Sequence, residues 1–401
     1  MVYGWRVVGG SFLSQAFAIG FFTYAVSLLT QPVQESFGVS VETVMYSLTL
    51  GTFIGLFAMP IVGSMLDKFS VRIISAIGVL LFALGLWLLA QTTSIYQYIA
   101  VFGLTMALVN SMAGSMVGSA VVSRWFTDNR GKALGVAATG TSVGGVLIPG
   151  LITYWLPDHG WRGAVENLAL LLVVVVLPIV VWAIRSWPAD VGIQEASTPE
   201  ETGSNEGHGQ LSLKDIVRNK NFWLLGACLG LLFSTYSAIL SNLATYASQS
   251  GHGEETASML IMIIAVSGLV GKLIFGLAAD MLNQKVALWV AQLLLAIGYS
   301  LFALEPSYWL IVAGCISMGL AAGGMLPVWG GLIANIFGLQ SYGLAFGLMA
   351  PIITTFVMMG FPVVGRLYDV TGSFSLSLWI STGLMLLAAL LLVPLRLSKN
   401  S

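Results

Sequence analysis

Lys272 is a basic residue in the middle of an apolar stretch, VSGLVGKLIFGLAAD (266–280). The nearest charged residues along the chain are Glu255 before it and Asp280 after it. If the stretch is a membrane-spanning helix, Lys272 lies about 12 Å from Asp280, near the midplane of a hydrocarbon core about 30 Å thick. A charge at that depth costs at least about 2.5–3.5 kcal/mol and usually marks a function. An ammonium group there could bind the carboxylate of an anion.

Three structural explanations for Lys272 compete with anion binding. The side chain could extend to the inner membrane surface, although it reaches only about half of that distance. It could pair with a carboxylate, but no Asp or Glu falls well inside a predicted span. Burial could also leave the amine uncharged. We favour anion binding, and we predict further substrate contacts from polar and aromatic residues at similar depth, for which helix packing is the alternative role. These residues are Tyr24, Asn110, Asn242, Tyr246 and Trp329.

The composition indicates a membrane protein. Of the 401 residues, 57% are hydrophobic and 8% are charged, whereas soluble domains usually carry about 25% charged residues. Apolar runs of about 20 residues recur along the chain, long enough to span the hydrocarbon core as helices and without the alternation of β-barrel strands. The chain is therefore predicted to be an all-α membrane protein with twelve transmembrane helices. Their predicted spans are 6–30, 41–66, 73–92, 97–123, 132–155, 164–185, 221–249, 257–279, 286–304, 308–336, 342–368 and 374–395.

The predicted helices fall into two bundles of six. The bundles cover residues 1–185 and 221–401, and a polar segment, 186–220, separates them as a linker that ends in a short surface helix. The loop GSMLDKFSVR after the second span resembles GLAADMLNQK after the eighth, and WFTDNRGKALG and IFGLQSYGLAFG repeat at nearly the same offset. Parallel six-helix repeats are typical of two-bundle secondary transporters, in which the substrate site lies between the bundles near the midplane.

Basic residues are unevenly distributed over the predicted loops, which indicates the orientation of the chain. With the N-terminus inside, the outer side keeps only Arg162 and Arg366. Both termini and the linker are therefore predicted to be cytoplasmic. Asp67 and Asp280 stand at the start of inner turns. Each carboxylate could cap a helix, pair with a nearby basic residue or be solvated. We predict an inner gate formed by Asp67, Arg72, Asp280 and Arg130.

Two motifs resemble those of the major facilitator superfamily. The superfamily signature G-x-x-x-D-[RK]-x-G-[RK]-[RK] is matched at four positions and differs at Ser70 and Val71. The matching residues are Gly63, Asp67, Lys68 and Arg72. The segment WFTDNRGKALGVAATGTSVGG (125–145) is similar to the fifth-span signature of the monocarboxylate porter and oxalate–formate antiporter branch. Its glycines are predicted to let neighbouring helix backbones approach closely, and they include Gly135, Gly140 and Gly144.

The resemblance implies the major facilitator fold and a secondary transporter that works by alternating access, with no cofactor and no enzymatic activity. In the branch, a cation of the eighth span stands four residues before the glycine of the following loop motif. Lys272 has that position relative to Gly276. Many monocarboxylate porters carry an Asp one turn earlier, and Gly268 stands there in this chain. One cation and no buried acid suit a substrate with one carboxylate, such as lactate, pyruvate or formate, without proton coupling.

We therefore predict a monomeric carrier of small organic anions in a bacterial inner membrane, surrounded by the lipid bilayer and with no nucleic-acid partner. Two other substrate classes remain open. Amphipathic compounds or drugs could be exported, in which case Lys272 would be incidental, and dicarboxylates such as oxalate could be exchanged. A membrane receptor or enzyme is the third alternative, against which we find no nucleophile–base set, metal-ligand spacing or phosphate-binding glycine loop.

Overall fold

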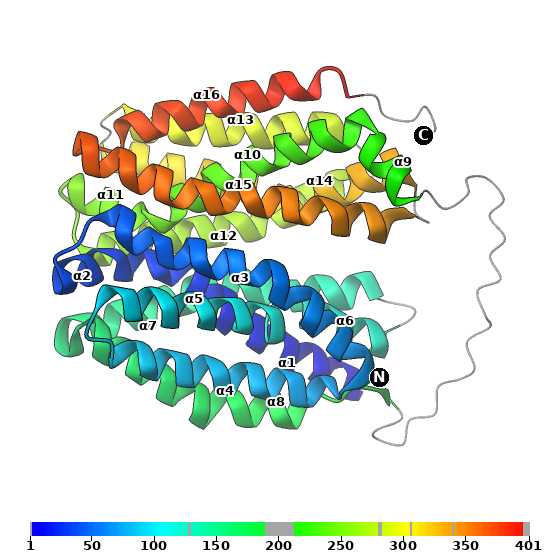
Figure 1. Cartoon of the computed structure of the whole chain (residues 1–401), viewed down its shortest axis with the longest axis horizontal. Coiled ribbons are helices and arrows are strands. Elements are labelled where there is room, and N and C mark those ends of the chain that lie inside the picture. Colours follow the sequence, from blue (N-terminus) through cyan, green and yellow to red (C-terminus); the bar gives the residue numbers. More distant parts are fainter. Residues whose placement is uncertain are drawn as a thin grey trace. The chain divides into compact units, whose positions relative to one another are not determined.

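A computed structural model describes residues 2–126, 130–188, 212–279, 283–304, 307–338 and 341–395, and every regular element among them is a helix (Figure 1). Two short segments are π-helical and are labelled η1 and η2. The elements before residue 189 are α1 (Val2–Ile19), η1 (Gly20–Ala25), α2 (Val26–Phe37), α3 (Val41–Lys68), α4 (Val71–Ala90), α5 (Ile95–Met112), α6 (Ser115–Trp125), α7 (Arg130–Leu171), η2 (Leu172–Val176) and α8 (Leu177–Ala183). Those after residue 211 are α9 (Leu213–Arg218), α10 (Lys220–Ser241), α11 (Leu243–Gln249), α12 (Glu254–Ala279), α13 (Gln284–Ala303), α14 (Tyr308–Phe337), α15 (Tyr342–Thr371) and α16 (Ser375–Leu392).

Eleven stretches of these helices are long and apolar enough to cross a membrane. One of them, Ala133–Ala183, has 51 residues, which corresponds to about 75 Å of helix and more than twice the thickness of a hydrocarbon core. Its backbone leaves the helical conformation at Gly160, where φ is 63°. This stretch therefore contains the fifth and sixth predicted spans, and the described helices account for all twelve.

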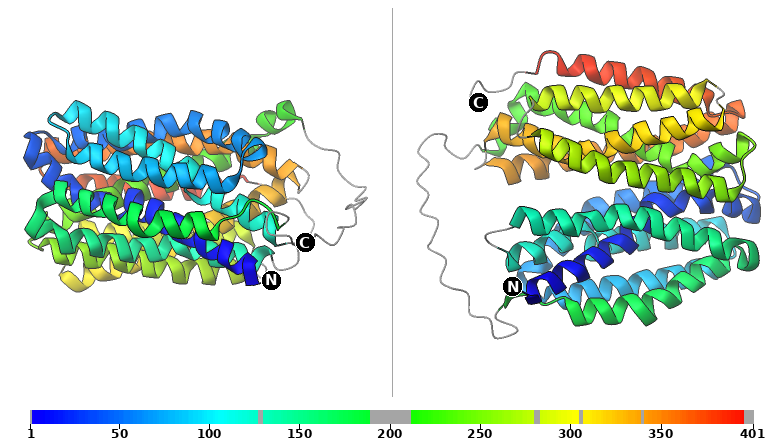
Figure 2. Two further views of the ribbon diagram at one scale, coloured as in Figure 1. Left: turned by 90° about the horizontal axis from the view of Figure 1, so that it is seen from below. Right: turned by 180° about the vertical axis from the view of Figure 1, so that it is seen from behind.

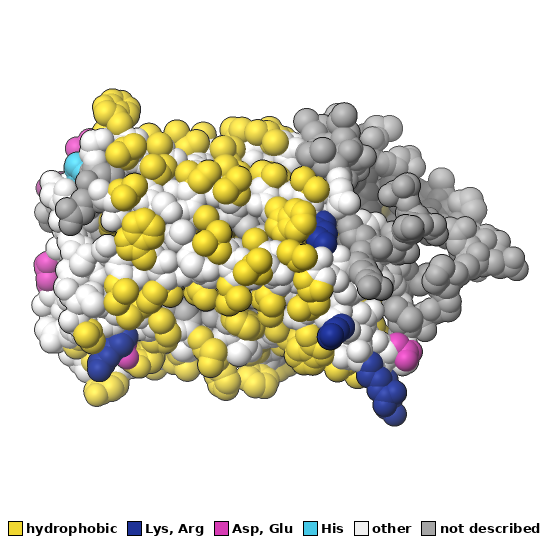
Figure 3. Space-filling model, turned by 90° about the horizontal axis from the view of Figure 1, so that it is seen from above, with side chains coloured by type: hydrophobic (Ala, Val, Ile, Leu, Met, Phe, Trp, Pro, Cys, Tyr) yellow, Lys and Arg dark blue, Asp and Glu magenta, His cyan; other side chains and the backbone are white. Residues whose placement is uncertain are grey.

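Large apolar side chains are exposed along these helices, as a surrounding of lipid requires. Phe57, Leu170 and Leu386 are each at least 60% exposed. Apolar side chains cover the face shown in Figure 3, where acidic and basic side chains appear only toward its two ends. The chain is a multi-pass helical membrane protein.

The chain divides into two compact units. Unit 1 comprises residues 1–39 and 46–205, and unit 2 comprises residues 40–45 and 206–401. The first turn of α3 thus groups with unit 2. The division predicted from the sequence places this turn in the first bundle, residues 1–185. Within each unit the helices run side by side (Figure 2). Most of the predicted linker, residues 189–211, lies outside the described residues, and its predicted surface helix is α9.

The same helices pack together in both units. In unit 1, α1 packs on α7, and α4 packs on α5 and α8. In unit 2, α10 packs on α15, and α13 packs on α14 and α16. We count the spans of each unit from one to six. In both units the first span packs on the fifth, and the third span packs on the fourth and on the sixth. These three pairings therefore repeat in both units, as the similar loop sequences indicate.

Glycines allow the α1–α7 contact. A Cβ on Gly140 would overlap the carbonyl oxygen of Phe12, and one on Gly144 would overlap that of Ala16. These two signature glycines have the predicted role, because only a residue without a side chain lets the backbones come this close. The prediction is wrong for Gly135, which is exposed and has no described atom within 4 Å of a Cβ position. Its face of α7 points away from the contact with α1.

Candidate functional site

Lys272 lies on α12, seven residues before the helix ends at Ala279. Its side chain is half-buried, at the edge between a buried face that includes Gly271 and Phe275 and an exposed face that includes Leu273 and Ile274. A Cβ on Gly271 would overlap the carbonyl oxygen of Leu320 on α14. The backbone of α12 beside Lys272 is therefore packed closely against α14.

Asn242 lies between α10 and α11, where the backbone turns away from helical geometry (φ −109°, ψ 6°). It is fully buried, and its side-chain amide donates to the carbonyl oxygen of Ala238 at 2.8 Å. The same amide lies 3.5 Å from the sulfur of Met45. The side-chain oxygen has no hydrogen-bond partner among the described residues. Such an orphaned acceptor costs about 1–3 kcal/mol and is a position where a ligand donor would be stabilising.

Tyr246 lies one turn further, on α11. Its hydroxyl donates to the carbonyl oxygen of Phe302 at 2.9 Å, and its ring packs against that of Phe302 with centroids 5.2 Å apart. The side chain therefore links α11 to α13, which is the role of a packing residue. A role in substrate binding would require this hydrogen bond to be exchanged, so Tyr246 remains a prediction.

Trp329 lies on α14 and is 6% exposed. Its ring stacks on that of Phe346 on α15, with centroids 3.9 Å apart and planes 14° apart. Its indole N–H has no hydrogen-bond partner among the described residues. A rigid ring with an unused donor is suited to binding an acceptor oxygen, and α14 is the helix that packs against α12.

The remaining predicted substrate residues lie in unit 1. Tyr24 is buried on η1, a π-helical segment, and such segments occur often at functional sites. Asn110 lies on α5, and its side-chain oxygen has no partner among the described residues. Ring contacts between Phe21 and Phe102 join η1 to α5. The predicted set is thus split, with four residues in unit 2 and two in unit 1.

The predicted inner gate lies mostly outside the described part of the molecule. Nothing is described of Asp280 or of the side chains of Asp67 and Arg130. Arg72 is described and is half-buried in the first turn of α4. The gate remains a prediction.

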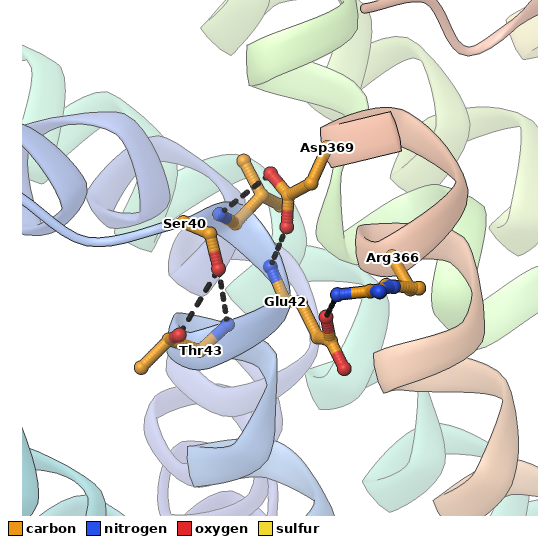
Figure 4. Close-up of polar contacts among 6 residues, drawn as sticks. Ser40, Glu42, Thr43, Arg366 and Asp369 are labelled. Atoms are coloured by element: carbon orange, nitrogen blue, oxygen red, sulfur yellow. Dashed lines mark hydrogen bonds and ion pairs between the residues drawn. The ribbon is translucent and has the colours of Figure 1, made fainter. Parts of the chain in front are cut away.

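A polar cluster that was not predicted caps the start of α3 (Figure 4). Asp369 on α15 accepts hydrogen bonds from the backbone amides of Val41 at 3.1 Å and Glu42 at 2.8 Å. The first amides of a helix have no acceptor within the helix, and a negative charge at this end is also favoured by the helix dipole. Arg366 forms a salt bridge with Glu42 at 3.3 Å. Nothing in the sequence analysis indicated that Asp369 and Arg366 would meet the start of α3.

The repeated helix packing and the apolar spans define a multi-pass membrane protein built from two similar six-helix units, with polar side chains buried inside each unit. The sequence profile of the Major Facilitator Superfamily matches residues 11–304 and 251–401. The chain therefore belongs to this superfamily, and it is a transporter of a small molecule and not an enzyme.

Similar proteins within the superfamily differ in their described cargo. Monocarboxylate transporter 13 of Rattus norvegicus is 24% identical, with 98% of this chain and 89% of the relative covered. An agnestins efflux protein of Paecilomyces divaricatus is 25% identical, with 98% of this chain and 87% of the relative covered. Among solved structures, the xylose transporter XylE from E. coli has a TM-score of 0.76 at 14% identity, with both chains covered completely. This last likeness concerns the fold alone.

Proposed function

We propose that this protein carries small organic monocarboxylate anions, of the lactate, pyruvate or formate kind, by alternating access. The observation that carries the proposal is the position of Lys272, a cation well inside α12 on a helix whose backbone packs closely against α14. A carboxylate bound there would form charge-assisted hydrogen bonds, which are roughly twice as strong as neutral ones. The similarity to monocarboxylate transporters supports this substrate class.

Two orphaned polar groups in unit 2 support the proposal. The indole N–H of Trp329 could donate to a substrate carboxylate, and the side-chain oxygen of Asn242 could accept from a substrate hydroxyl. A 2-hydroxy acid presents both of these groups, whereas a purely apolar compound presents neither. Because no Asp or Glu of the sequence lies deep in a span near Lys272, we propose uniport or anion exchange rather than proton coupling through a carboxylate.

The test compares Lys272→Gln with the wild type in proteoliposomes, using counterflow of labelled lactate without a pH gradient. Loss of a charged hydrogen-bond partner costs about 1.5–3 kcal/mol, which corresponds to roughly 10- to 150-fold weaker binding. Lys272→Arg should keep part of the activity, with altered selectivity because of its planar guanidinium. Lys214→Gln, which removes an exposed cation of α9, is the matched control and should transport normally. Normal counterflow by Lys272→Gln would refute the proposed role.

Export of amphipathic compounds is a second candidate, favoured by the similarity to the agnestins efflux protein. Under this function Lys272 would not contact the substrate, so Lys272→Gln would leave efflux of an amphipathic dye unchanged. The purified protein would then gain thermal stability from such compounds and none from carboxylates. A ligand at 100 times its Kd stabilises the folded state by about 2.7 kcal/mol, so a panel of both classes separates the two functions.

A further inference from the structure

A polar cleft of about 450 Å³ opens in unit 1 where several of its helices end. Its position is independent of the residues proposed to bind substrate. The cleft lies between the C-terminal ends of α3 and α6, the N-terminal end of α4 and the segment after α8. It is lined by Leu66, Lys68, Phe69, Ser70, Arg72, Arg124, Arg185, Ser186 and Trp187.

Four cationic side chains converge on this cleft from four different segments. They are Lys68, Arg72, Arg124 and Arg185. None of them forms a salt bridge with an acidic side chain of the described residues. Asp67 precedes Lys68 in the sequence, and its side chain is outside the described part. Four cations that no described acidic side chain pairs with form a site that attracts a polyvalent anion.

Two of the arginines are held in place by the ends of helices. Arg124 donates through one terminal nitrogen to the carbonyl oxygen of Leu66 at 2.8 Å, and its guanidinium lies 4.5 Å from the ring centre of Trp187. Arg185 donates through one terminal nitrogen to the carbonyl oxygens of Val181 and Ile184, both at 2.9 Å. A guanidinium has five N–H donors, so each arginine keeps donors that these bonds do not use.

The other two cations have no partner among the residues that the structure describes. Lys68 and Arg72 form no hydrogen bond or ion pair with any described residue. Beside them, the hydroxyl of Ser186 accepts from the backbone amide of Val71 at 2.9 Å and is 2.9 Å from the hydroxyl of Ser70. The cleft thus combines two cations that no described residue binds with two arginines held by helix ends. Such a set suits the several acceptor oxygens of a phosphate group.

Exposed apolar side chains border the same cleft, and they favour a phospholipid over a free phosphate as its ligand. Phe69 and Trp187 line it and are 57% and 47% exposed, and Ile73, next to Arg72 in the sequence, is 56% exposed. Aromatic residues of this kind concentrate at the membrane–water interface. A free phosphate would not require an apolar border, whereas a phospholipid would contact it with its glycerol and acyl groups.

We propose that this cleft binds the phosphate headgroup of an anionic phospholipid. The four cations contact the phosphate oxygens, and the acyl chains lie along Phe69 and Ile73. By the distribution of basic residues, this end of the helices is the predicted cytoplasmic one, where basic pockets between transmembrane helices bind anionic lipids. The lipid ties the ends of α3, α4 and α6 to the segment after α8.

The test measures retention of phospholipids by the purified full chain, using native mass spectrometry after exchange into mixtures of phosphatidylglycerol and phosphatidylcholine with matched acyl chains. The wild type should retain phosphatidylglycerol preferentially. Each basic residue contributes roughly fivefold to the affinity for anionic lipid, so Lys68→Gln/Arg72→Gln should weaken retention about 25-fold. The control Lys214→Gln/Lys220→Gln removes two exposed cations outside the cleft and should behave as the wild type.

Three outcomes would overturn the proposal. Equal losses in the cleft variant and the control would mean that the attraction is general rather than due to the cleft. Displacement of phosphatidylglycerol by millimolar inorganic phosphate would identify a site for free phosphate. If the double variant does not fold, Lys68→Gln alone is decisive, because the exposed Lys68 has no described partner to lose. It should reduce retention about fivefold, and unchanged retention would refute the proposal.

Discussion

Adding a single methyl group at Gly144 should separate α1 from α7. A Cβ at this position would overlap the carbonyl oxygen of Ala16, and it would lie 2.7 and 2.8 Å from two carbon atoms of the same residue, whereas ordinary contact begins at 3.4 Å. All three atoms belong to the backbone, so no rotamer change relieves the overlap. The carbon at 2.7 Å alone requires the helices to move apart by about 0.7 Å, and the overlapping oxygen requires more. A gap of 0.5–1 Å removes about a quarter to a half of the dispersion energy of each affected contact.

The magnitude follows from this displacement. Insertion of a methyl group into a well-packed interface costs about 1–3 kcal/mol, and the upper part of that range is expected because only backbone atoms are involved. Gly135→Ala is the matched control on the same helix, since no described atom lies within 4 Å of its Cβ position. Alanine there should stabilise the helix by about 0.5–1 kcal/mol. The two substitutions should therefore shift stability in opposite directions.

Denaturation of the purified variants tests this reasoning with two probes. Cys228 and Cys315 are buried in unit 2, so a thiol-reactive dye reports the opening of that unit, whereas tryptophan fluorescence reports both. Gly144→Ala should lower the midpoint and Gly135→Ala should raise it. Shifts of the same sign and size would refute the backbone-contact argument. A fall seen by fluorescence alone would show that unit 1 opens separately.

Two further predictions concern groups that cap helix ends. Asp369→Asn should lower stability by about 1 kcal/mol, because it removes a charge from the N-terminus of α3. Amide exchange at residues 41–45 should speed up, whereas Glu42→Gln should have a smaller effect. Unchanged exchange in Asp369→Asn would contradict the cap. The pKa of Asp215 is lowered by hydrogen bonds from the side chain and backbone of Ser212 and by Arg218. A lowered carboxyl pKa stabilises the folded state above the unfolded value of about 3.9 and loses that effect as the pH falls through the folded value. Acidification below about pH 4 should therefore increase exchange in α9, corrected for intrinsic rates, and Asp215→Asn should remove this pH dependence.

Hydrophobicity and helix length were enough to predict the spans, because in a membrane both are local properties of the sequence. The short helix α9 was predictable for a similar reason, since Ser212 and Asp215 form a capping box within four residues. The role of Asp369 was not predictable, because its partner Val41 is 328 positions away along the chain. Any hydrogen-bond acceptor near the start of α3 could have capped that helix. The error at Gly135 has the same origin, since spacing along α7 does not say which face meets α1.

The internal repeat supplies a comparison for Lys272 within the same molecule. Lys272 stands four residues before Gly276 after the eighth span, and Met59 stands four residues before Gly63 after the second. Met59 lies on α3 and is 44% exposed, so the corresponding position of unit 1 accepts an uncharged side chain. The packing of this fold therefore does not require a cation at that point, and a charge there is costly in a membrane. A substrate carboxylate bound by Lys272 would lower that cost in unit 2, and this is the interaction that we propose.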